Sequence, residues 1–226
     1  MTARAVAKER PILFSGPMIR ALLEGRKTQT RRIMKPGPPN GCGVLAAPPN
    51  GWRYEGVEYQ DESVERCPYG VPGDRLWCRE TLDGLMGCDA SYVADDKRIV
   101  DAHPDGWDVW RDGRSLPPRV VPSIFMPRWA SRITLEVTEV RVQRLQEISE
   151  EDAQAEGARY FADIPAGPYG DIGTRWSMLY DNPENTDHCL RRASLAFGQA
   201  WNAINGNSAP WGSNPYVWAI TFRVIQ

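Results

Sequence analysis

The chain changes abruptly at Gly25, and this change constrains the fold more than any other feature. Before it, residues 17–24 carry apolar side chains at helical spacing, with a proline in the first position. Gly25 suits the residue just past a helix end, because glycine adopts positive φ without strain. After it, residues 26–32 read RKTQTRR. Since alternate strand residues share a face, Gln29 and Arg31 lie opposite the threonines. We therefore predict a helix over 17–24 that turns directly into a basic strand.

Cations gather around this turn in a chain that is otherwise slightly acidic. The net charge is −2, which argues against indiscriminate binding to polyanions. A group of six cations with one acid among them nevertheless falls between residues 20 and 35: Arg20, Arg26, Lys27, Arg31, Arg32 and Lys35. Cations and hydroxyls beside a tight turn suit an anionic or polar ligand, so RNA or a nucleotide is the expected partner. The alternative is a solvated strand edge, which Lys and Arg commonly protect.

Length and composition predict a single domain that spans residues 1–226. They indicate no membrane partner and no obligate protein partner. No apolar run approaches the roughly 18 residues of a membrane span. The first residues lack the apolar core of a signal peptide, so a cytoplasmic location is expected. The five cysteines include no C-x-x-C pair, which favours free thiols. A zinc site from Cys42, Cys67, Cys88 and His103 would match no common spacing, so no metal or cofactor is expected.

Period-two alternation or short apolar runs predict several further strands. They are Pro11–Phe14, Arg75–Glu80, Tyr92–Val100, Ile133–Val142 and Tyr216–Val224. In the fourth, the apolar parity shifts from Val137 to Val140, so we expect a bulge near Thr138–Glu139, as closure of a small barrel requires. In the last, every second residue from Tyr216 to Val224 is expected to point inward. Glu80 at the end of the second is either a site acid or, as we favour, a solvated charge.

Two more helices are predicted, over 150–156 and 188–204. The longer one carries an apolar stripe typical of a core-facing helix: Leu190, Ala193, Phe197, Trp201 and Ile204. The shorter one begins after Ser149, a good N-cap, and ends at Gly157. Glu156 then falls in the last turn, where its charge opposes the helix dipole by roughly 0.3–1 kcal/mol. This misfit marks Glu156 as a candidate site residue, and the alternative is an exposed acid that tolerates the cost.

Stretches rich in Pro and Gly predict large insertions at about 36–70, 82–122 and 158–187. The second contains Trp107 and Trp110, and Trp129 follows it, with several arginines nearby. Such aromatic side chains stack on unpaired bases or, more commonly, pin irregular loops to the body. We favour the packing role.

Four stretches together resemble the ASCH family of small β-barrels related to the PUA RNA-binding domain. They are GRKTQTRR (25–32), PGDRLW (72–77), RITLEVTEVRVQRLQEISEEDAQAEG (132–157) and PYVWAITFRV (215–224). PSIFMPRWASRITLEVTEV resembles the larger ASCH-like proteins of phages and prophages, although Phe125 stands where that pattern often has histidine. The resemblance implies an α/β (α+β) fold: a small mixed, mostly antiparallel PUA-like β-barrel with flanking helices.

The resemblance also implies an activity, since some small ASCH proteins are amidohydrolases that deacetylate N4-acetylcytidine with a Lys, a Thr and a Glu. The matching residues are Lys27, Thr30 and Glu156. A neutral lysine would activate the threonine hydroxyl, and the carboxylate would serve the leaving amine. The expected ligand-binding residues are Arg26, Arg31, Arg32 and Arg128. Lys27 and Thr30 have opposite strand parity, so they converge only if Lys27 belongs to the turn. A ribonuclease and a non-catalytic RNA- or nucleotide-binding module are the alternatives.

Overall fold

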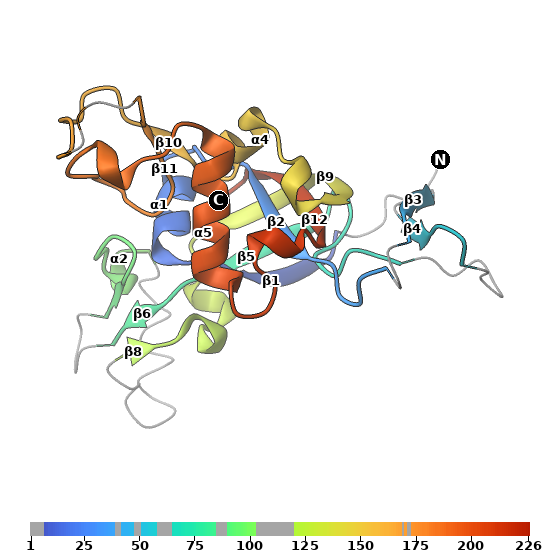
Figure 1. The fold of residues 1–226 in the computed structure, drawn as a ribbon. Coiled ribbons are helices and arrows are strands. Elements are labelled where there is room, and N and C mark those ends of the chain that lie inside the picture. Colours follow the sequence, from blue (N-terminus) through green and yellow to red (C-terminus); the bar gives the residue numbers. More distant parts are fainter. Residues whose placement is uncertain are drawn as a thin grey trace.

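The computed structural model describes residues 7–38, 42–47, 51–57, 65–84, 90–102, 120–168, 170 and 173–226. Within them the chain has a mixed α+β fold built around a five-stranded, mostly antiparallel sheet (Figure 1). In spatial order its strands are β1 (Glu9–Leu13), β5 (Arg75–Arg79), β9 (Thr134–Arg144), β12 (Tyr216–Val224) and β2 (Gln29–Ile33). β1 and β5 run parallel, and the other neighbouring pairs are antiparallel.

β1 and β2 form the two edges of this sheet. No backbone pairing joins them in the described part of the chain. Arg32 Nη2 on β2 instead donates to the carbonyl of Leu13 on β1 at 2.7 Å. Of the mostly antiparallel barrel that the sequence predicts, the mostly antiparallel sheet is therefore present, and a side chain rather than backbone pairing joins its described edge strands.

Three smaller sheets have no backbone pairing with the main one among the described residues, and one lies within each insertion predicted at 36–70, 82–122 and 158–187. Their strands are β3 (Val44–Ala47) with β4 (Gly51–Tyr54), β6 (Leu82–Asp83) with β7 (Ser91–Tyr92) and β8 (Val120–Val121), and β10 (Arg159–Tyr160) with β11 (Trp176–Ser177). Figure 1 shows the β3–β4 hairpin projecting from one end of the molecule. The main sheet is thus assembled from the segments between the insertions.

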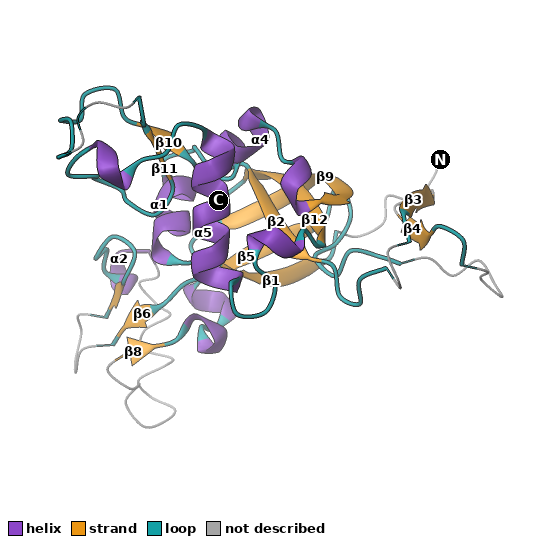
Figure 2. Ribbon diagram, viewed as in Figure 1, coloured by secondary structure: helices purple, strands orange, loops and turns teal. Residues whose placement is uncertain are grey.

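Helices cover the sheet rather than interrupt it (Figure 2). The α-helices of the described residues are α1 (Gly16–Leu23), α2 (Ile99–Ala102), α4 (Glu150–Ala155) and α5 (Ala193–Asn205). Short 3-10 turns connect other elements: η2 (Ser123–Phe125), η3 (Arg128–Ala130), η4 (Leu145–Glu147), η5 (Thr186–His188) and η6 (Trp211–Ser213). The helices predicted over 17–24 and 150–156 are confirmed to within one residue at each end.

The third predicted helix begins five residues later than expected, at Ala193. Before it, Leu190 bridges to Trp176 in β11 instead of starting a helical turn. Glu150 of α4 then accepts hydrogen bonds from the Ala193 N–H and the Ser194 hydroxyl. Because this carboxylate satisfies the first amide of α5, a contact between helices sets where α5 starts.

The strand predicted over 92–100 is wrong. Only Ser91–Tyr92 is extended there, as β7. The chain then turns, with the Tyr92 N–H donating to the Lys97 carbonyl and Asp96 at φ 57°. α2 starts at Ile99. Aspartate tolerates positive φ better than most residues, and this turn chemistry overrides the strand propensity of the stretch.

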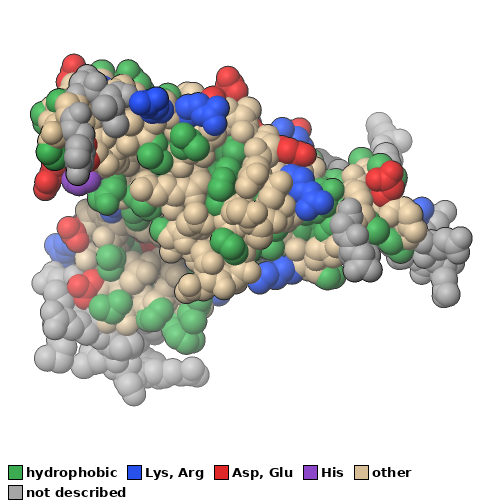
Figure 3. Space-filling model, viewed as in Figure 1, with side chains coloured by type: hydrophobic (Ala, Val, Ile, Leu, Met, Phe, Trp, Pro, Cys, Tyr) green, Lys and Arg blue, Asp and Glu red, His purple; other side chains and the backbone are tan. Residues whose placement is uncertain are grey.

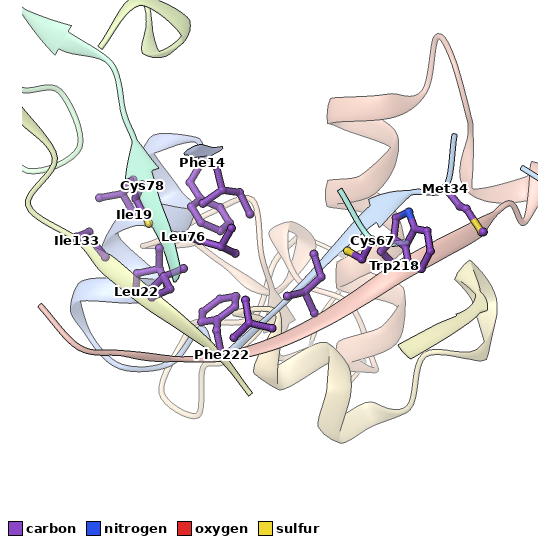
Figure 4. Packing of buried hydrophobic residues seen from close by; sticks show 14 of the residues in the cluster. Phe14, Ile19, Leu22, Met34, Cys67, Leu76, Cys78, Ile133, Trp218 and Phe222 are labelled. Carbon is purple, nitrogen blue, oxygen red and sulfur yellow. The ribbon is translucent and has the colours of Figure 1, made fainter. Parts of the chain in front are cut away.

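The main core fills one side of the sheet, where α1 packs (Figure 4). Phe14 and Phe222 lie there with ring centroids 6.4 Å apart. β12 also contributes Trp218 and Ile220 to this core, as predicted, but Val224 at its end is 45% exposed, contrary to the prediction. A second core lies between β12 and α5, where its members are buried: Leu145, Ile148, Ala153, Ala158, Ala193, Phe197, Trp201 and Val217.

The predicted bulge in β9 is confirmed. β12 pairs Thr221 with Glu139 and the next residue, Phe222, with Val137, so Thr138 is the extra residue. The extra residue lets Val137 and Val140 face the same core despite their opposite parity.

Two further findings concern membrane spans and metal ligands in the described part of the chain. No helix among the described residues is long and apolar enough to cross a membrane. The described cysteines, Cys42, Cys67, Cys78 and Cys189, are free thiols, and no group of metal-ligating side chains occurs among the residues that the structure describes.

Candidate functional site

The site forms where the C-terminal ends of α1 and α4 meet. Both ends are Schellman turns with a glycine in the left-handed region, Gly25 at φ 72° and Gly157 at φ 112°. A Cβ on Gly157 would lie 3.3 Å from the Cβ of Ala21, so the absence of a side chain permits the close approach. The Thr28 N–H donates to the Ala155 carbonyl at 2.8 Å and ties the second turn to the start of β2.

Lys27 lies between these two helix ends with its side chain 0% exposed. Its ammonium donates three hydrogen bonds of 2.8 Å, to the Gln29 carbonyl, the Glu156 carbonyl and Glu156 Oε2. One cation therefore satisfies a terminal carbonyl of α4 and pairs with the acid in its last turn. This contact explains why a glutamate is tolerated at the unfavourable end of the helix dipole.

The Glu156 carboxylate is held from a second side by Arg31. Arg31 Nη1 lies 3.1 Å from Glu156 Oε1, and Arg31 Nη2 lies 2.7 Å from Asp152 Oδ2. Asp152 precedes Glu156 by one helical turn, so α4 presents both carboxylates to the same guanidinium. The Gln29 amide also donates to Asp152, at 3.1 Å. Arg141 also pairs with Asp152, at 3.2 Å, so three cations surround the two carboxylates.

The two faces of β2 separate as the sequence predicts. On one face Arg31 donates to the Gln29 side chain, and on the other Arg32 Nη1 donates to Thr30 Oγ1 at 2.8 Å. Lys27 precedes the strand, as its convergence with Thr30 requires. Even so, no hydrogen bond joins these two described side chains, and Thr30 is 0% exposed. The structure therefore brings Lys27, Arg31 and Glu156 together, with Thr30 on the opposite strand face.

A cavity of about 540 Å³ opens beside this cluster. Its polar wall includes Arg31, Arg32 and Glu156. The apolar and partly aromatic part of its lining comes from the loop before α1, from α1 and from α5: Phe14, Met18, Phe197, Ala200, Trp201 and Ile204. Ile204 is 58% exposed, contrary to the core role predicted for the whole stripe, because it stands at this cavity.

Electrostatics at the cluster follow from burial. Desolvation lowers the pKa of Lys27 below that of a free lysine, and the charge and hydrogen bond of Glu156 oppose this shift. Burial raises the pKa of Asp152, but Arg31 and the Gln29 hydrogen bond outweigh it, so this pKa lies below the usual value. Because three acceptors surround Lys27 Nζ, the geometry is that of an ammonium.

The remaining predicted ligand residues are dispersed. Arg26 joins the ends of the two helices: it donates to Glu24 Oε2 at the end of α1, at 2.6 Å, and to the Gly157 carbonyl just past α4, at 2.9 Å. Arg128 pairs with Glu9 at 3.1 Å and lies over the Trp77 ring, and it does not line the cavity. The structure therefore does not bring Arg128 to the Lys27 cluster.

Only part of the basic cluster near Gly25 reaches the surface: the side chains of Lys27 and Arg31 are fully buried, whereas Arg20 and Arg26 are partly exposed and Lys35 is exposed. On the face drawn in Figure 3, basic and acidic side chains are interspersed. The expectation that Glu80 is solvated is also wrong. Glu80 is 2% exposed and paired with Arg132, because the chain around Asp95 folds over the end of β5.

The packing role predicted for Trp129 is confirmed, since it packs against the core around Tyr92 and Met126. Trp107 and Trp110 lie outside the described residues. Sequence reasoning missed Asp152 and Phe197 as components of the site. The four-residue spacing of Asp152 and Glu156 on a helix was the available signal for the former. For Phe197 there was none, since a helical aromatic stripe reads as ordinary core.

Comparison with known proteins adds no assignment. No protein-family model, no curated protein and no solved structure matches this chain.

Proposed function

We propose that this chain is a nucleoside-directed hydrolase of the ASCH type, with a PUA-like fold, that cleaves the amide of an N4-acylated cytidine. The observation that carries the proposal is the 2.8 Å contact between Lys27 Nζ and Glu156 Oε2 at the wall of a cavity. These residues are 129 apart in sequence. They are two of the three that the resemblance assigns to catalysis.

The dimensions of the cavity favour a small substrate. Its volume of about 540 Å³ falls within the roughly 300–1,000 Å³ typical of small-molecule sites. A nucleoside has a flat base that can pack on the aromatic side chains of the lining, and polar edges that can bind its arginines. A polynucleotide-binding surface would instead need an open basic groove, and here Lys27 and Arg31 are buried.

In the proposed reaction a hydroxyl oxygen adds to the acyl carbon and the carbon–nitrogen bond to N4 breaks. The Glu156 carboxylate accepts the proton of the attacking hydroxyl and delivers it to the departing amine. With water as the nucleophile, the products are the carboxylic acid and cytidine. With Thr30 as the nucleophile, an acyl ester forms first, and water then hydrolyses it to the same products.

The filled donor set of Lys27 defines its role in this scheme. An ammonium bound to three acceptors orients Glu156, whereas a neutral amine would leave one acceptor without its proton. Lys27 is therefore a positioning residue for the Glu156 carboxylate. Direct attack by water is the favoured route, since Thr30 is fully buried, accepts a hydrogen bond from Arg32 and is not among the residues that line the cavity.

A second candidate is a binding module that recognises a nucleoside or nucleotide without chemistry. The ion pairs that join Lys27, Arg31, Glu156 and Asp152 support it, because a paired cluster also serves as a rigid wall.

The test is to incubate the pure protein with N4-acylcytidines, other acylated nucleosides and short RNAs, and to identify products by mass. Release of cytidine and free acid supports the hydrolase, and Thr30→Ala distinguishes the routes, since only the ester route requires the hydroxyl. Cleaved RNA would identify a ribonuclease. Binding of cytidine without any product would identify the binding module.

A further inference from the structure

A second, smaller chamber of about 140 Å³ adjoins the main cavity. The two share several lining residues: Ser15, Met18, Glu156, Met178, Ala200 and Ile204. Glu156 therefore stands at the junction of two spaces. A ligand whose reacting bond lies at this carboxylate can extend one part into each.

The smaller chamber has apolar walls. α1 supplies Pro17 and Ala21, and the segment after β11 supplies Leu179. Besides Glu156, three charged side chains line its edge: Arg26 and Asp181 are paired within the protein, and Arg159 lies over the Phe161 ring. Arg26 binds Glu24 and the Gly157 carbonyl, and Asp181 binds Arg20. An apolar group therefore fits this chamber better than a charged one.

The volume indicates the size of that group. An engineered apolar cavity of about 150 Å³ in another protein binds benzene. The chamber here is nearly as large, so it matches a phenyl ring or a branched chain of four or five carbons. An acetyl group would leave most of the chamber unfilled and would forgo the apolar contacts.

We propose that this chamber is the acyl subsite, and that the enzyme prefers N4-acylcytidines whose acyl group is larger than acetyl, with an aromatic or branched apolar body. The proposal rests on the proposed function. It assigns the main cavity to the nucleoside and the smaller chamber to the acyl group, with the scissile amide between them at Glu156.

The first test compares the wild-type protein on N4-acetyl-, N4-isovaleryl- and N4-benzoylcytidine. We expect kcat/KM for the two larger substrates to exceed that for acetyl by about tenfold or more, the usual effect of filling an apolar pocket. A preference for acetyl would overturn the proposal.

Two matched substitutions locate the subsite. Leu179 lines only the smaller chamber and Leu13 only the main cavity. Leu179→Trp is expected to lower the benzoyl-to-acetyl ratio of kcat/KM by about tenfold, whereas Leu13→Trp should change it by less than about twofold. Leu179→Phe serves the same purpose if the larger residue impairs folding. Equal effects of the two tryptophans on the ratio would count against this placement of the acyl group.

A binding measurement separates this proposal from the proposed function. 4-Fluorobenzamide carries the apolar body without the nucleoside, and its binding is followed by fluorine NMR. Binding that Leu179→Trp removes and Leu13→Trp retains supports the subsite even if no acylcytidine is hydrolysed. Turnover of acylcytidines with no binding of the probe and no preference among acyl groups would refute the subsite and leave the hydrolase intact.

Discussion

Two buried ion clusters in this molecule have similar composition and different surroundings. In one, Glu156 binds Lys27 and Arg31. In the other, Glu80 binds both Nε and Nη2 of Arg132, at 3.0 and 2.8 Å. Both glutamates are 2% exposed. Only Glu156 lines the two cavities described above.

The surroundings of Glu80 explain the difference. Arg132 also donates two hydrogen bonds to Asp95, at 2.8 and 2.9 Å. Its guanidinium lies 3.8 Å from the centroid of the Tyr92 ring. The cluster therefore fastens the 82–122 insertion to β5 and β9. Burial raises the pKa of Glu80, and Arg132 only partly opposes this. Burial and a displaced pKa thus occur at both clusters, and access to a cavity is what distinguishes a candidate site from a structural fastening.

The two clusters should differ most in how strongly kcat responds when the glutamate of each is replaced by glutamine. Glu156→Gln should lower kcat on an N4-acylcytidine by about 10²–10⁴-fold, the usual cost of losing a positioned proton-transfer group. Glu80→Gln, the matched control, should change kcat by less than about threefold. Steady-state kinetics on both variants measures this. Full activity of Glu156→Gln would show that Glu156, like Glu80, has no role in catalysis.

The cluster of Glu80, Arg132 and Asp95 should contribute more to the free energy of unfolding than an ion pair at the surface. Arg132→Met leaves Glu80 and Asp95 facing each other without a cation, so the free energy of unfolding should fall by roughly 3–5 kcal/mol. Arg223→Met is the control, because Arg223 is exposed and its pair with Glu136 lies at the surface. Its effect should stay within about 1 kcal/mol. Denaturant unfolding followed by circular dichroism compares them, and similar losses would contradict the fastening role.

The pH dependence of activity tests the state of Lys27. A lysine is charged below its pKa, and burial lowers this pKa. If the ammonium orients Glu156, kcat/KM should decline on the alkaline side as Lys27 loses its proton, at a pH below the titration of a free lysine. A rate that instead rises through the same range would identify Lys27 as a neutral base. The pH–rate profile of the wild type distinguishes these outcomes, with the profile of Lys27→Met as the control.

The smallest expected difference is between the effects on KM of replacing Arg32 and of replacing Arg128. Arg32 lines the cavity, so Arg32→Ala should raise KM by roughly tenfold with little change in kcat, as expected for a binding contact. Arg128→Ala should change either constant by less than about twofold, because Arg128 pairs with Glu9 away from the cluster. A larger effect of Arg128→Ala on KM would mean that the substrate reaches beyond the cavity.

Local features of this chain were predictable from its sequence. Helix α1 and the faces of β2 follow from residues 17–32, and the β9 bulge follows from the parity shift at Thr138. Glu156 was singled out because it opposes its own helix dipole. Each of these features depends on neighbours within a few residues, and short-range periodicity and capping report on such neighbours reliably.

Tertiary structure alone decided how these parts combine. The burial of Glu80 depends on Asp95 and Arg132, and the start of α5 depends on Glu150. The contact of Lys27 with Glu156 needs two glycine turns, far apart in the chain, to pack against each other. Local pattern marks a charge as unusual, but it does not show whether the fold will cover that charge, pair it, or leave it at a cavity. That outcome depends on which distant segments pack around it, because desolvation and pairing are set by the whole surroundings of a group.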